Sequence, residues 1–100
     1  MNKAELKDRT KKFAHRCVRL SAALPQTILG KIICGQLIRA STSVAANYRA
    51  ACLAQSKKAF ISKISIVIEE SDETEFWMEF IVEEDILKKD LVEGLLKEAH

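Results

Sequence analysis

Apolar side chains recur at every third or fourth position along most of the chain, and this period predicts helices. In the first such segment, about residues 3–23, the spacings alternate between four and three, which is typical of a helix packed lengthwise against its neighbours. The positions of this seam are Leu6, Thr10, Phe13, Cys17, Leu20 and Leu24. Pro25 ends the segment, and Gln26 or Thr27 opens the next helix.

The second segment, about residues 27–54, predicts a helix that is apolar on two sides. At 1.5 Å per residue it would be ~42 Å long, and its only charges are Lys31, Arg39 and Arg49. The other helices of so small a chain cover one apolar side, so the second side indicates a contact between subunits. The residues expected in the core or at that contact are Ile28, Ile32, Ile38, Tyr48 and Trp77.

Two further helices are predicted, over about residues 57–82 and 88–100. Ser56 is placed to cap the first of them. Because the connections are short, successive helices are expected to run antiparallel. The sequence therefore predicts one all-α domain over residues 1–100, an antiparallel up-down-up-down four-helix bundle. The pattern reaches His100 without a stop signal, so a longer form of the chain is expected to extend this helix.

Antiparallel pairing of the second and third helices brings charged residues together. With the turn at residues 55–56, Arg39 lies opposite Asp72. It is therefore within one turn of both Glu70 and Glu73. We expect a buried structural ion pair that aligns the two helices, and removing one partner from such a pair costs ~3–5 kcal/mol. A binding site for a small ligand or ion inside the bundle is the alternative.

Charge is sorted along the chain. Residues 1–63 carry thirteen of the sixteen Lys and Arg, whereas residues 64–100 carry twelve of the fourteen Asp and Glu. The formal net charge of +2 hides this separation. Two kinds of partner follow from it, a polyanion or the chain's own oppositely charged half.

The predicted first helix carries cations away from its apolar seam. These candidate nucleic-acid-binding residues are Lys7, Arg9, Lys11, Lys12, Arg16 and Arg19. In a ring of subunits they would repeat, and phosphate binding gains from the cumulative release of counterions. No recognition helix or aromatic stripe is visible, so we expect binding to RNA or DNA without base specificity. In a rival interpretation, acidic residues from Glu79 onwards meet this helix in a neighbouring subunit, which leaves an assembly or protein-interaction module.

The sequence lacks the patterns of an enzyme. A carboxylate-bridged metal centre in a bundle needs Glu-x-x-His, and the chain offers Glu70-x-x-Glu73 with no histidine in reach. No Ser or Cys has a histidine and an acid at recognisable spacing, and no Gly-rich loop suits phosphates. We therefore expect no catalytic activity, no metal and no cofactor.

The location expected from the composition is the cytoplasm. Residues 1–12 lack the apolar centre of a secretory signal, and Pro and Gly interrupt the most apolar stretch, residues 20–38. Neither export nor a membrane partner is therefore expected. Cys17, Cys34 and Cys52 are odd in number and form no C-x-x-C pair, which is typical of reduced thiols inside the cell.

Three segments together resemble a known family. They are Arg39-Ala-Ser-Thr-Ser-Val-Ala-Ala-Asn-Tyr-Arg49, Ser56 to Phe60, and Glu70-Ser-Asp-Glu-Thr-Glu-Phe-Trp77. On these segments the chain is similar to the four-helix-bundle proteins encoded in intervening sequences of bacterial large-subunit ribosomal RNA genes. The resemblance covers nearly the whole chain and implies an up-down-up-down bundle, commonly assembled into a cyclic homo-oligomer of five subunits. A distant relative, the accessory protein of diversity-generating retroelements, engages nucleic acid and a reverse transcriptase, so a nucleic-acid-processing protein is a further implied partner.

Three positions depart from the family pattern. Many relatives continue Asn-Tyr-Arg with Glu, where this chain has Ala50, and often carry Arg where it has Cys52 and Leu53. The missing charges argue against a nucleic-acid surface near the second turn. They also make the end of the second helix more apolar, which favours a subunit contact there.

Overall fold

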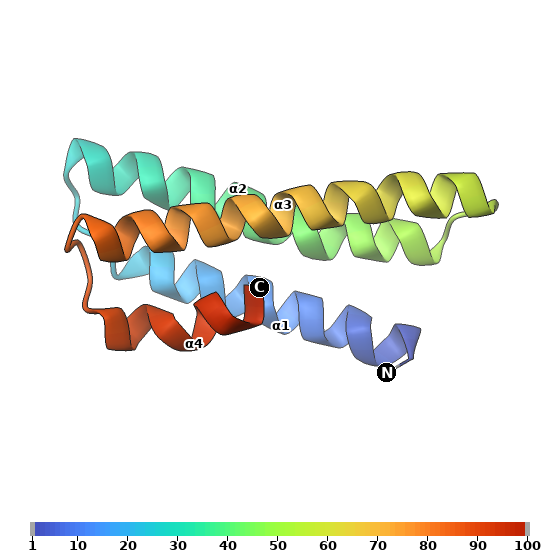
Figure 1. Cartoon of the computed structure of the whole chain (residues 1–100), viewed down its shortest axis with the longest axis horizontal. Helices are drawn as coiled ribbons and strands as arrows, with labels where there is room; N and C mark the ends of the chain where they lie inside the picture. The colour runs from blue at the N-terminus through green and yellow to red at the C-terminus, as the bar shows by residue number, and fades with distance from the viewer. Residues whose placement is uncertain (1, 100) are drawn as a thin grey trace.

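The computed structural model describes residues 2–99, which form four helices and no strand. The helices are α1 (Lys3–Ala22), α2 (Ile28–Cys52), α3 (Lys57–Glu83) and α4 (Lys89–Ala99). Figure 1 shows them lying side by side along the 44 Å length of the molecule. The predicted all-α class is confirmed, and the helix ends lie within two residues of the predicted ones. His100, at the end of the last predicted helix, lies outside the described residues.

Each of the first three helices begins at a polar side chain that accepts a hydrogen bond from the helix backbone. The Glu5 N–H donates to Asn2 Oδ1 at 2.8 Å, and Asn2 Nδ2 in turn donates to Glu5 Oε1 at 3.0 Å. In α2 and α3, Thr27 and Ser56 accept from the N–H groups three residues ahead, both at 3.0 Å. Such caps satisfy backbone donors that the first turn leaves unpaired, which explains why these helices start where they do.

The connection between α1 and α2 and the connection between α3 and α4 are both tight, for different reasons. At Gly30 a Cβ atom would lie 2.0 Å from the carbonyl oxygen of Pro25, so only glycine lets the chain fold back this closely. At the third connection, Asp85 adopts a left-handed conformation with a φ of 53°. This conformation lets the Ile86 N–H donate to the Ile81 carbonyl at 3.0 Å, which closes the end of α3.

Each helix packs against two others. α2 packs against α1 and α3, and α4 packs against the same two helices, so α1 and α3 occupy opposite corners of the bundle. α4 has 11 residues whereas α3 has 27. As Figure 1 shows, α4 therefore covers only the half of the molecule nearest the third connection. In residues 2–99, one half is therefore built from four helices and the other from three.

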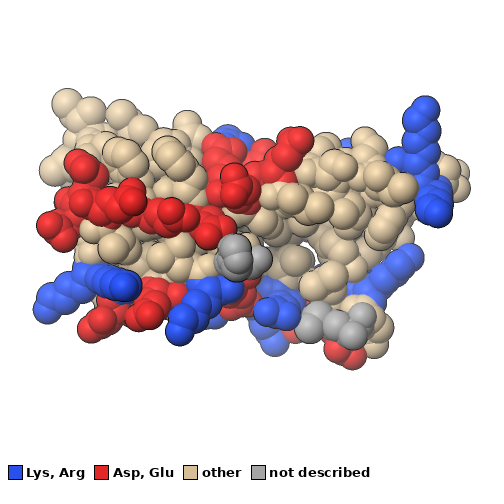
Figure 2. Space-filling model, viewed as in Figure 1, with Lys and Arg blue, Asp and Glu red and all other residues tan. Residues whose placement is uncertain are grey.

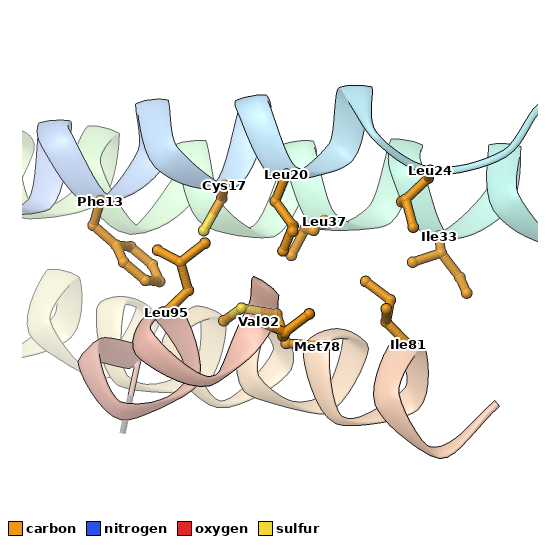
Figure 3. Close-up of a cluster of buried hydrophobic side chains, with 10 residues drawn as sticks. All are labelled: Phe13, Cys17, Leu20, Leu24, Ile33, Leu37, Met78, Ile81, Val92 and Leu95. Carbon is orange, nitrogen blue, oxygen red and sulfur yellow. The ribbon is translucent and has the colours of Figure 1, made fainter. Parts of the chain in front are cut away.

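The main apolar core lies in the four-helix half and receives side chains from every helix (Figure 3). Leu37 and Met78 are fully shielded from solvent there. Burial also raises the pKa of the Cys17 thiol to about 12, which keeps the thiol protonated and unreactive. The members of the core are Phe13, Cys17, Leu20, Leu24, Ile33, Leu37, Met78, Ile81, Val92 and Leu95.

Candidate nucleic-acid interface

The cations predicted to bind nucleic acid are divided between two sides of α1. Lys7 and Lys11 line a groove between α1 and α2. The others do not line that groove: Arg9 and Arg16 reach a residue of α4, and Lys12 reaches Asp8 at the edge of the groove. We name these others the α1 row; its members are Arg9, Lys12, Arg16 and Arg19. The six predicted residues therefore form two surfaces, whereas the sequence analysis treated them as one.

The α1 row is partly paired with acids. Glu98 on α4 accepts from Arg16 Nη1 at 2.6 Å, and its other oxygen lies 3.7 Å from Arg9 Nε. Lys12 Nζ lies 2.9 Å from Asp8 Oδ2, one turn earlier on α1. The hydrogen bond to Asp8 raises the pKa of Lys12, so this lysine stays charged at neutral pH. The row therefore carries four full positive charges, three of which face an acid.

The cations of these ion pairs are open to solvent, and so is Asp8, whereas the Glu98 side chain is only 21% exposed. The side chains of Arg9, Lys12 and Arg16 are 54%, 73% and 48% exposed. Exposed pairs of this kind contribute only ~0–1 kcal/mol, because water and salt compete for the same charges. Water and salt therefore compete most strongly for the Lys12–Asp8 pair, in which both side chains are exposed.

A second group of cations gathers where α2 and α3 connect. Lys57 and Lys58 stand in the first turn of α3, and Lys3 lies over the Phe60 ring, 5.9 Å from its centre. The first turn of a helix is already partly positive, so the two α3 lysines oppose the helix dipole. Figure 2 shows basic side chains at this end and a band of acidic side chains along the opposite half of α3. The sequence analysis did not select these lysines, although their position directly after the cap Ser56 could have indicated a positive helix start.

Arg39 reaches from α2 to the two α3 carboxylates that antiparallel pairing predicts. Its Nη1 lies 3.2 Å from Glu70 Oε2, and its Nη2 forms an ion pair with Glu73. Glu73 also accepts a hydrogen bond from Trp77 Nε1 at 3.4 Å. The hydrogen bond from Arg39 holds the pKa of Glu73 below its ordinary value.

The expectation that this ion pair is buried is wrong for the single chain. Nearly half of the Arg39 side chain, 48%, is exposed, as are 19% of Glu70 and 36% of Glu73. The reason is that Arg39 stands at the outer edge of the contact between α2 and α3, where its long side chain crosses the surface. The structure thus gives a solvated clamp between two helices.

Because the clamp is solvated, replacing Arg39 with alanine is expected to cost at most ~1 kcal/mol, well below the cost of breaking a buried pair. The lowered pKa of Glu73 gives this contribution a pH dependence. It is present above the ordinary carboxyl pKa of 4.5 and is lost as pH falls through the lower folded value. Urea unfolding of wild type and variant between pH 7 and ~3 should show the two stabilities converging.

Lys31→Ala is the matched control, since it removes another exposed cation from α2. Its effect should be smaller and should not depend on pH across this range. A loss of several kcal/mol in the Arg39 variant would contradict the exposed geometry.

The five residues expected in the core or at a subunit contact differ in how far their side chains are exposed to solvent. Tyr48 is buried at 6% exposure, and Ile38 and Trp77 are half-buried. Ile28 and Ile32 are 82% and 52% exposed. The second apolar side of α2 is therefore open to solvent near its start in the single chain.

The possible metal ligands and the apolar lengths of the helices bear on two further kinds of site in residues 2–99. That range holds no group of three or more His, Cys, Asp or Glu side chains placed to bind a metal ion. Nor does it contain a helix with the length and apolar character needed to cross a bilayer. The lack of catalytic activity and of a cofactor stays a prediction from the sequence.

Known proteins resemble this chain in both sequence and fold. The chain matches the family described as 23S rRNA-intervening sequence protein over residues 2–100. It is also similar to the crystal structure of a protein of unknown function from the S23 ribosomal protein family of Bacteroides thetaiotaomicron VPI-5482. The two chains are 32% identical with a TM-score of 0.86, over 93% of this chain and 86% of that chain. No curated protein matches. The resemblance noted from the sequence is confirmed, and the chain belongs to the 23S rRNA-intervening sequence protein family.

Proposed function

We propose that the chain is a non-enzymatic cytoplasmic accessory protein that assembles with copies of itself and binds RNA or DNA through the α1 row. Its four helices form an antiparallel up-down-up-down bundle, and the bundles close into a cyclic homo-oligomer. Five subunits are proposed on the family resemblance. A nucleic-acid-processing protein is a further proposed partner on the same ground.

The single observation that carries this proposal is the separation of charge across the bundle. The α1 row and the acidic half of α3 belong to helices at opposite corners. The many acids of α3 are therefore held away from the row within one chain. Asp8 and Glu98 pair with members of the row, and Asp90 lies beside Arg16 and Arg19. The Lys12–Asp8 pair, in which both side chains are exposed, is the one that a phosphate would displace most easily.

The proposed binding reads the nucleic-acid backbone and not the bases. The row consists of long, exposed cations, whose natural contacts are phosphate oxygens. One chain offers only four such residues. Repetition of the row around an oligomer would raise the number of neutralised phosphates, and each adds to affinity through counterion release.

A salt titration tests the proposal. Short RNA and DNA oligomers of unrelated sequence should bind the assembled protein at ~50 mM salt with similar affinities. The logarithm of the binding constant should fall linearly with the logarithm of salt concentration, by about 0.9 per neutralised phosphate on duplex DNA and 0.7 on single strands. Absence of binding at ~50 mM, or affinity that does not respond to salt, would overturn the proposal.

The alternative is an assembly or protein-interaction module without a nucleic-acid ligand. The observation that favours it is that acids already face Arg9, Lys12 and Arg16. The same titration separates the two, because this alternative predicts a multimer that stays unbound at low salt.

A further inference from the structure

An open groove of about 790 Å³ lies between α1 and α2. It exists because the facing side chains are small, notably Ala14, Ala45 and Ala46, so the two helices do not fill the space between them. Asp8 is one acid among the lining residues, and the cations outnumber it. These cations are Lys7, Lys11 and Arg49. The groove is therefore apolar in its floor and positive at its edges.

The outward side of α3 has the opposite shape and charge. Ile61, Ile68 and Phe76 are 53%, 64% and 53% exposed. Spacings of seven and eight residues put them on one side of the helix. Exposed acids accompany them, namely Glu69, Asp72, Glu79 and Glu83. Together these seven residues are the α3 ridge.

We infer that the α3 ridge of one copy docks in the α1–α2 groove of a second copy. The large side chains of Ile68 and Phe76 enter the space that the alanines leave open, as knobs enter holes between packed helices. The acids of the ridge approach the cations of the groove, and this complementarity selects the partner. The inference rests on the self-assembly proposed above and names the two surfaces that carry it.

The contact is head-to-tail. The groove belongs to α1 and α2, whereas the ridge belongs to α3, which sits at the corner opposite α1. One copy cannot satisfy both surfaces with itself. Each docking event leaves one free groove and one free ridge, so the contact repeats; it gives a closed ring where the rotation between copies closes and a filament where it does not.

This docking would give the cations of α1 two different roles, one in the subunit contact and one in nucleic-acid binding. Lys7 and Lys11 would be covered by the neighbouring copy. Arg9, Arg16 and Arg19 of the α1 row lie on the side toward α4 and would stay open in the assembly, whereas Lys12 reaches Asp8 at the edge of the groove. Self-assembly and nucleic-acid binding can therefore use the same helix, with these three arginines outside the subunit contact.

Mixing two blocked variants tests the geometry. Ile68→Asp with Phe76→Asp removes the ridge and keeps the groove, while Ala46→Trp fills the groove and keeps the ridge. All three positions are exposed in the single chain. By light scattering, wild type should be a multimer and each variant alone should have the 11.3 kDa mass of one chain. An equimolar mixture should give twice that mass and nothing larger, because only one productive contact can form.

Leu91→Asp is the matched control, since Leu91 is 60% exposed on α4 and belongs to neither surface. It should keep the wild-type mass. Lys7→Glu with Lys11→Glu blocks the groove by charge alone and replaces Ala46→Trp if circular dichroism shows that the tryptophan variant is unfolded.

Each contrary outcome has a distinct meaning. A wild-type multimer that survives in all the variants would overturn this inference and leave the proposed assembly intact. Variants that dissociate but do not recombine on mixing would overturn the head-to-tail contact. A monomeric wild type would overturn both the inference and the assembly, while binding through the α1 row would still be measured by the salt titration.

Discussion

Replacing Leu37 with alanine is expected to lower the free energy of unfolding by about 2–5 kcal/mol. Leu37 is fully buried, and the core around it receives side chains from all four helices. The smaller side chain loses its transfer free energy and leaves a cavity that the rigid neighbours fill only in part. Urea denaturation followed by circular dichroism measures the effect, at one fixed protein concentration because assembly adds to apparent stability.

The control is Leu53→Ala, since Leu53 is 74% exposed in the connection between α2 and α3. Its effect should stay within ~0.5 kcal/mol. Equal losses at Leu37 and Leu53 would mean that the core is not where the structure places it, or that Leu53 is covered in the assembled protein. Repeating the measurement on the ridge variant separates those two meanings.

Neutralising Lys12 and Arg19 together is expected to weaken binding to RNA and DNA of any sequence. Both residues belong to the α1 row and are exposed, so glutamine at these positions should leave the fold intact. Each lost phosphate contact should make the slope of the salt dependence shallower by about one unit. Titrations of wild type and of the Lys12→Gln, Arg19→Gln variant across ~50–200 mM salt provide the comparison.

Two further variants make this prediction specific. Lys57→Gln with Lys58→Gln removes the same charge from the start of α3 and should change binding less. Glu98→Gln should strengthen binding, because it frees Arg9 and Arg16 from their acid. If the α3 pair had the larger effect, the nucleic-acid surface would lie at the end of the bundle and not along α1.

The sequence predicted those features of the fold that depend on helix geometry and on short connections. The three-and-four spacing of α1 identified its buried side through Phe13, Cys17 and Leu20, because helical period alone decides which side chains share a face. The short second connection likewise determined the alignment of α2 with α3, so Arg39 was placed within one turn of Glu70 and Glu73, the acids that it contacts.

The features that the sequence did not predict depend on how deeply a side chain is buried and on contacts between residues far apart in the chain. The helical period tells on which side of α2 Arg39 lies. It does not tell that this side, at the edge of the contact with α3, is exposed to solvent. The pairing of Glu98 with Arg16 joins residues 82 positions apart, and no local pattern reports it. The groove beside Ala45 and Ala46 was also missed, because small apolar residues look the same in a sequence whether they close a gap or leave one.

Within residues 2–99, the apolar interior is covered unevenly, and this has a consequence for how this part of the chain resists unfolding. Beyond the end of α4, a slot of about 290 Å³ reaches Phe13, Tyr48 and Ile64, so water approaches the apolar interior there. Regions with thinner apolar cover open locally at lower free energy than the centre of a domain. In the chain of residues 1–100, backbone amides near the start of α1 and of α3 should consequently exchange with deuterium sooner than those around Ile33 and Ile81.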